Sequence, residues 1–202
     1  MASPLRLLLI GDGERDAVTV PCLVERILGA DVEGETDEWA RLHEGKGYGQ
    51  KLRFAIRSAK AQGLHGLVVT LDRDKAPKSE RLRKLKEARD ADRHRDIFVP
   101  TAVGEARPHG EAWLLDDQRA VREALGLPSD TDVPTGRRAR NPKTELLKLL
   151  RQSPRRRERP LVVFPEIAKL VELSRCPHAE QTGFQNFSDD VVRELGSLAA
   201  AR

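Results

Sequence analysis

Two continuous apolar runs, each ended by acidic turn residues, dominate the hydrophobic pattern of the chain. Residues 5–10 run into Gly11-Asp12-Gly13, and residues 67–71 run into Asp72-Arg73-Asp74. A short apolar run bounded by turn residues is typical of a strand buried on both faces of a parallel sheet. The pattern therefore predicts two buried strands, each followed directly by carboxylates.

Helical spacing separates these strands and continues beyond them. Apolar residues at helical intervals predict helices over the segments 18–28, 52–59, 78–94, 111–115, 118–125, 142–150 and 189–198. Weaker signals predict strands at 38–42 and 96–103. Alternating strands and helices indicate an α/β fold: a Rossmann-like parallel sheet of about four strands flanked by helices, with a helical C-terminal part.

Length and composition favour a single domain overall. The chain has 202 residues, of which 39% are hydrophobic and 34% are charged. We expect an α/β core over 1–127, and a basic linker with a helical extension over 128–202 packed on that core.

Basic residues are concentrated in that C-terminal part, although the net charge is only +4. The cluster consists of Arg137, Arg138, Arg140, Lys143, Arg155, Arg156, Arg157 and Arg159. Such a cluster can neutralise phosphates and so favours contact with nucleic acid. The alternative is an ordinary solvated surface segment.

The cysteines and the hydropathy narrow the class of protein further. Cys22 and Cys176 show no metal-ligand spacing, which argues against a zinc site, and Cys22 fits an apolar helix face. No stretch resembles a signal peptide or a membrane span. We therefore expect a soluble cytoplasmic protein with no membrane partner.

The acids at the two strand ends are the main candidate for chemistry. Asp12 and Asp16 are four residues apart, and Asp72 and Asp74 are two apart. Carboxyl ends of neighbouring parallel strands meet at one edge of a sheet, so both pairs would lie together. Clustered carboxylates repel unless a cation lies among them, and oxygen ligands suit Mg²⁺ or Mn²⁺. The alternative is helix capping by the first pair and a solvated loop for the second.

Other charged residues could complete such a site. Glu111 follows the next predicted strand and is a candidate further ligand, with Glu105 as an alternative from the same turn. Lys46, in a glycine-rich loop, and Lys143 could bind phosphate or a transition state. For Tyr48, packing is the favoured interpretation. Bound metal could activate water for phosphodiester cleavage, with the number of ions left open.

These motifs, in this order, resemble the TOPRIM domain, most closely the OLD-type nucleases and small stand-alone TOPRIM-like proteins of bacterial defence loci. The matching segments are 8–16, 67–74 and 110–115, with further counterparts at 45–47 and 141–143. Each motif alone has low specificity, and their order and spacing carry the resemblance. The resemblance implies a TOPRIM-like core, metal-dependent cleavage or nicking of nucleic acid, and a stabilising role for Lys143. The metal ligands that it implies are Asp12, Asp16, Asp72, Asp74 and Glu111.

The sequence departs from the family pattern at its first motif. Asp12 stands where a glutamate is usual, so Glu14 is an alternative first ligand, and Arg15 replaces a usual small hydroxyl residue. The segment 33–37 spells the motif more closely, but no buried strand precedes it, so we reject it.

The predicted function is a metal-dependent endonuclease or nickase of nucleic acid in bacterial defence or DNA processing, with DNA favoured over RNA and both left open. The alternative is a catalytically weak or inactive adaptor of an ATPase. That ATPase would be a separate protein, because no GxxxxGK[ST] motif occurs. A phospho-acceptor receiver is disfavoured, because no lysine follows a fifth predicted strand. A homo-oligomer is left open.

Overall fold

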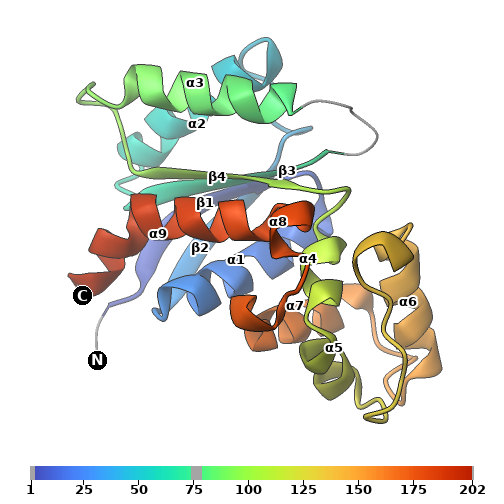
Figure 1. The fold of residues 1–202 in the computed structure, drawn as a ribbon. Helices are drawn as coiled ribbons and strands as arrows, with labels where there is room; N and C mark the ends of the chain where they lie inside the picture. The colour runs from blue at the N-terminus through green and yellow to red at the C-terminus, as the bar shows by residue number, and fades with distance from the viewer. Residues whose placement is uncertain (1–2, 74–78, 202) are drawn as a thin grey trace.

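The sheet is parallel and has its two buried apolar strands at the centre. The computed structural model describes residues 3–73 and 79–201. In this part of the chain, four strands form one parallel sheet in the order β2-β1-β3-β4 (Figure 1). The strands are β1 (Leu5–Gly11), β2 (Val32–Glu38), β3 (Gly66–Asp72) and β4 (Thr101–Ala106). The predicted α/β class, with about four parallel strands and a helical C-terminal part, is confirmed.

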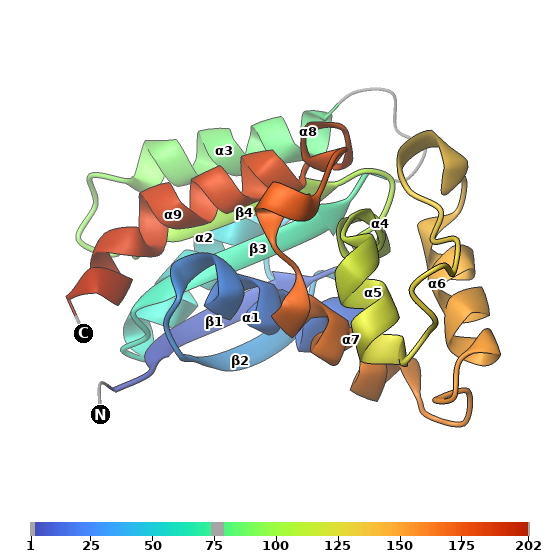
Figure 2. The same cartoon turned by 60° about the horizontal axis from the view of Figure 1, so that its bottom comes forward.

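Helices cover both faces of the sheet and extend beyond one end. They are α1 (Glu14–Leu28), α2 (Gly47–Ala61), α3 (Glu80–Asp92), α4 (Glu111–Asp116), α5 (Gln118–Leu125), α6 (Pro142–Gln152), α7 (Pro160–Leu170), α8 (Ala179–Thr182) and α9 (Phe184–Ala200). Helices α2 and α3 lie on one face, and α1 and α9 lie on the other (Figure 1). Figure 2 shows α4, α5, α6 and α7 grouped at the end where the strands finish.

From Leu7 to Ile10, β1 is apolar at every position because both of its faces are covered there, whereas Arg6 is exposed near its start. Leu7 and Leu9 belong to the core formed with α1 and α9, whereas Leu8 and Ile10 belong to the core formed with α2 and α3. Side chains alternate between the faces of a strand, so a strand between two helical layers needs apolar residues at every position.

Two strands are present but their predicted bounds are wrong. Residues 39–42 form a turn, and the strand is β2, a polar edge strand that an apolar pattern does not reveal. The fourth strand begins only at Thr101. The motif-like segment 33–37 lies within β2, so its acids line an exposed sheet edge and do not follow a strand as the motif requires.

The C-terminal helix completes the cover of the sheet and is longer than the sequence pattern predicts. Phe187 of α9 lies against Gly104 of β4, where an added Cβ would be 2.4 Å from the phenyl ring. The Phe187 ring also stacks on Trp113 of α4, with ring centroids 4.8 Å apart. The end of the chain therefore supports the segment that carries Glu111. No helix within the described residues is long and apolar enough to cross a membrane.

Candidate active-site cleft

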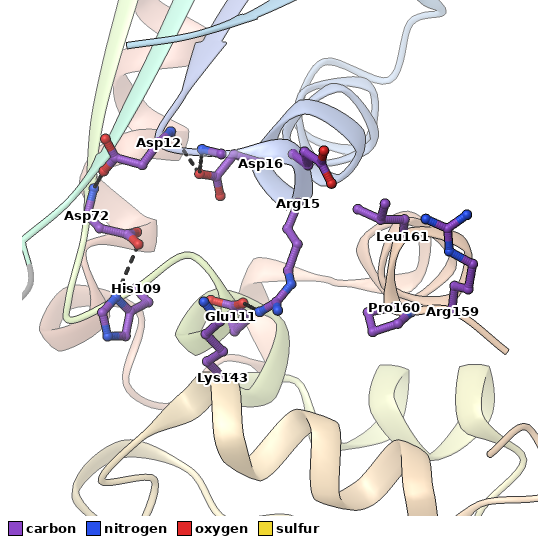
Figure 3. Close-up of a pocket in the computed structure, with 12 residues that line it drawn as sticks. Asp12, Arg15, Asp16, Asp72, His109, Glu111, Lys143, Arg159, Pro160 and Leu161 are labelled. Carbon is purple, nitrogen blue, oxygen red and sulfur yellow. Dashed lines mark hydrogen bonds and ion pairs between the residues drawn. The ribbon is translucent and has the colours of Figure 1, made fainter. Parts of the chain in front are cut away.

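Three carboxylates meet at the carboxyl ends of β1 and β3, which are neighbours in the sheet. Asp12 follows β1, Asp16 lies in the first turn of α1, and Asp72 ends β3. An Asp12 carboxylate oxygen accepts a hydrogen bond from the Asp72 backbone N–H. The Asp16 Oδ2 accepts from the backbone N–H groups of Asp12 at 2.9 Å and Gly13 at 3.2 Å. Backbone donors thus fix two of the three carboxylates (Figure 3).

The segment between β4 and α4 holds the carboxylate of Asp72. His109 Nδ1 lies 3.1 Å from Asp72 Oδ2, and the backbone N–H of Gly110 donates to Asp72 Oδ1 at 3.0 Å. The next residue, Glu111, is buried, and its Oε1 accepts a hydrogen bond of 2.7 Å from Arg15 Nη1. This ion pair connects the first turn of α1 to the start of α4.

These groups line one open cleft of about 460 Å³. Its lining residues are Asp12, Gly13, Glu14, Arg15, Asp16, Asp72, His109, Glu111, Lys143, Arg159, Pro160 and Leu161. Figure 3 shows Lys143 at the start of α6 near Glu111, with Arg159 and Pro160 at the start of α7. The sheet edge contributes acidic side chains and the C-terminal helices contribute basic ones. The cleft therefore has carboxylates that suit a metal ion and cations that suit a phosphate.

Burial and crowding raise the pKa values of two of these acids. The pKa of Asp72 is raised to about 7, first by burial and then by the charges of Asp16 and Asp12. The pKa of Asp16 is raised to about 6, mainly by burial, with further contributions from the charges of Glu111 and Asp12. Carboxylates this close together repel one another when all are ionised, and a bound cation would offset that repulsion.

The structure brings most, but not all, of the predicted site residues together. Asp12, Asp16, Asp72, Glu111 and Lys143 share the cleft, and the alternative ligand Glu14 lies exposed at its edge. Asp74 lies outside the described residues.

Lys46 and Glu105 do not line the cleft. Lys46 lines a separate hollow between α2 and α3. Glu105 lies within β4 and not in a turn. Its carboxylate accepts hydrogen bonds from Ser79 Oγ at 2.6 Å and Arg107 Nε at 3.2 Å. Its carboxylate is buried among these partners, so the structure gives it a local packing role.

Sequence reasoning did not select Arg15, His109 or Arg159 as cleft residues. Arg15 was visible only as a departure from the family motif, and Arg159 only as one member of a basic cluster. Some residues of that basic cluster form ion pairs within the protein. Arg155 pairs with Glu158 and Glu166, and Arg138 pairs with Asp132. Among the cluster residues whose side chains the structure describes, Lys143 and Arg159 line the cleft.

The comparisons with known proteins add no identification. No family model matches the chain, and neither the curated proteins nor the solved structures gave a match. Within residues 3–73 and 79–201, no three His, Cys, Asp or Glu side chains already have the spacing of a metal site, so Asp12, Asp16 and Asp72 would have to move to ligate one ion together.

We predict that Gly11→Ala disturbs the cleft, because Gly11 leaves room for Asp16. An added Cβ at Gly11 would be 2.4 Å from the Asp16 Cβ, so the first turn of α1 would have to shift. We expect a loss of about 1–3 kcal/mol in the free energy of unfolding, measured by urea titration. Gly13→Ala is the matched control, because its Cβ would meet nothing within 4 Å and its backbone is extended. Equal stability of the two variants would contradict this account.

Proposed function

We propose that the cleft binds Mg²⁺ or Mn²⁺ and hydrolyses phosphodiester bonds of nucleic acid, with DNA as the favoured substrate. One observation carries the proposal: Asp12, Asp16 and Asp72 meet at adjacent strand ends in a cleft whose other wall carries Lys143 and Arg159. The resemblance of segments 8–16 and 67–74 to TOPRIM motifs points in the same direction.

The donor chemistry fits a hard divalent cation. Asp12, Asp16 and Asp72 offer carboxylate oxygens, the ligands that Mg²⁺ and Mn²⁺ prefer. The pKa values of Asp16 and Asp72 are raised first by burial and then by neighbouring carboxylates, and a cation would favour their ionised forms. Asp74 remains a further candidate ligand from its sequence position. Glu111 already accepts a hydrogen bond from Arg15, so we leave it out of the proposed ligand set.

The protein's own groups bind and orient the reactants. When bound, the metal ion supplies a more acidic water and positive charge at the scissile phosphate. Lys143 and Arg159 attract the phosphodiester and hold it against the acidic wall. His109 and the Gly110 N–H fix the rotation of the Asp72 carboxylate, and backbone N–H groups do the same for Asp16. Fixed carboxylates lower the cost of ordering the site during the reaction.

The test is a nicking assay on supercoiled plasmid with the full chain. We expect conversion to open circles with Mn²⁺ or Mg²⁺, and none in EDTA. Linear duplex, single-stranded DNA and RNA substrates, run in parallel, define the preference. A pure protein that binds Mn²⁺ by calorimetry but cleaves none of these substrates would overturn the proposal.

A non-catalytic adaptor of a separate ATPase is the second candidate. It is favoured by the way the cleft satisfies its own acids: Glu111 pairs with Arg15, and Asp72 with His109 and Gly110 N–H. Absence of Mn²⁺ binding at pH 8, together with co-purification of an ATPase, would support this candidate over the nuclease.

A further inference from the structure

Arg15 is the most firmly oriented cation in the cleft. Its Nη1 donates to the buried Glu111 carboxylate at 2.7 Å, and its guanidinium carbon lies 5.9 Å from the ring centroid of Phe164, a buried residue of α7. The three residues come from α1, α4 and α7, so the arginine is held from two sides by separate helices. Figure 3 shows the Arg15 side chain running from α1 toward Glu111.

This arrangement leaves donors of Arg15 for a ligand. A guanidinium carries five N–H donors, and within the described residues only Nη1 makes a side-chain hydrogen bond. The side chain is 30% exposed and lines the cleft between the acids and Lys143. A planar guanidinium fixed by a carboxylate and an aromatic ring suits two-pronged recognition of a phosphate.

We propose that Arg15 binds a substrate phosphate, with Glu111 and Phe164 as its positioning residues. The inference rests on the proposed function in one respect: the phosphate belongs to the nucleic-acid backbone that the cleft is proposed to cleave. It assigns Glu111 to holding Arg15 and not to holding metal. Arg15 thereby joins Lys143 and Arg159 in a set of three cations facing the three aspartates.

The experiment measures binding separately from cleavage. Fluorescence anisotropy gives the Kd of a short fluorescein-labelled DNA duplex, with Ca²⁺ in place of Mn²⁺, over a series of salt concentrations. We expect Arg15→Gln to raise Kd about 10- to 100-fold, and to lower the slope of log K against log salt by about 0.9, because one phosphate contact is lost. Arg15→Lys should keep the slope and lose about 3- to 10-fold in affinity, because the charge stays but the planar fork is lost.

Glu111→Gln tests the positioning role. We expect a Kd increase of about 3- to 10-fold, no further increase when it is combined with Arg15→Gln, and unchanged Mn²⁺ affinity by calorimetry. Arg57→Gln is the matched control, because Arg57 also lies over a phenylalanine ring, Phe54, but is exposed on α2 away from the cleft. Thermal melts confirm that each variant is folded.

The outcomes separate this inference from the proposed function. Arg15-dependent DNA binding without Mn²⁺-dependent nicking would contradict the nuclease proposal and support the phosphate site. Mn²⁺-dependent nicking with unchanged Kd and KM in Arg15→Gln would support the nuclease proposal and contradict the phosphate site. Loss of Mn²⁺ binding in Glu111→Gln, or no duplex binding by the unaltered chain, would also overturn the inference.

Discussion

Asp72→Asn should abolish Mn²⁺-dependent nicking and, at the same time, stabilise the fold at neutral pH. Asp72 ends β3, one of the two central strands, and its pKa is raised by burial and then by the charges of Asp16 and Asp12. Removing its charge takes away a proposed metal ligand, so we expect the rate to fall by about 1000-fold or more. Asparagine keeps an oxygen that can accept the Gly110 N–H bond, so the local structure has no reason to collapse.

The stability gain follows from the raised pKa of Asp72. The folded-state pKa is about 7, against 3.8 for an ordinary aspartate, so the folded protein binds this proton more tightly than the unfolded chain. The resulting stability is fully present below pH 4 and is lost as pH rises through about 7. Asparagine stays neutral over this whole pH range, so it has no such pH-dependent loss of stability. At pH 8 the variant should therefore be more stable by about 1–3 kcal/mol, and at pH 4 the difference should nearly vanish.

Urea titrations at the two pH values and the plasmid assay measure both effects. Asp130→Asn, a change at an exposed loop residue, is the control and should alter neither. Mn²⁺ should narrow the stability difference at pH 8, because it binds the unaltered site and neutralises its charge. A variant that still nicks at the original rate would remove Asp72 from the site, and a variant less stable at pH 8 would contradict the charge-repulsion account.

The hydrophobic pattern predicted the central strands of the sheet correctly and misplaced the two edge strands, for one physical reason. Strands β1 and β3 have neighbours on both sides and helices on both faces, so their sequences are almost entirely apolar, with Arg6, Thr70 and the terminal Asp72 as exceptions. Edge strand β2 pairs only with β1 and is largely exposed, so its polar sequence contains no strand signal. Strand β4 is short and contains Gly104 and Glu105, so its start was misplaced by the apolar residues before it.

The same distinction explains which cleft residues were found. Asp12 and Asp72 lie at the ends of buried strands, and Asp16 lies in the helical turn that follows the first of them. A local pattern combined with parallel topology was therefore enough to bring them together. Arg15 and Arg159 gain their positions from contacts of α1 and α7 with distant segments, and no local pattern encodes such contacts. Lys46 is the opposite case: its glycine-rich loop suggested a place near the acids, but it lines a hollow between α2 and α3, and phosphate binding by Lys46 stays a prediction.

Asp190→Ala should cause the largest loss of stability outside the apolar core. Asp190 of α9 is almost fully buried, and its Oδ2 accepts hydrogen bonds of 2.8 Å from both Arg89 Nη1 and the backbone N–H of Val103. Arg89 comes from α3, which lies on the other face of the sheet (Figure 1), so this ion pair links helices on opposite faces. The carboxylate therefore joins both helical layers and satisfies a donor of the edge strand.

Alanine at this position would leave a buried guanidinium and a strand N–H short of an acceptor. We expect a loss of about 3–5 kcal/mol in urea unfolding, since one partner of a buried ion pair is removed while the other stays. Glu194, 3.5 Å from Arg89, offers only partial replacement. Asp189→Ala is the matched control: this neighbouring carboxylate is exposed and accepts one hydrogen bond, from Gln185, so its loss should cost under about 0.5 kcal/mol. If the two variants unfold at the same urea concentration, the network is not what holds α3 and α9 to the edge of the sheet.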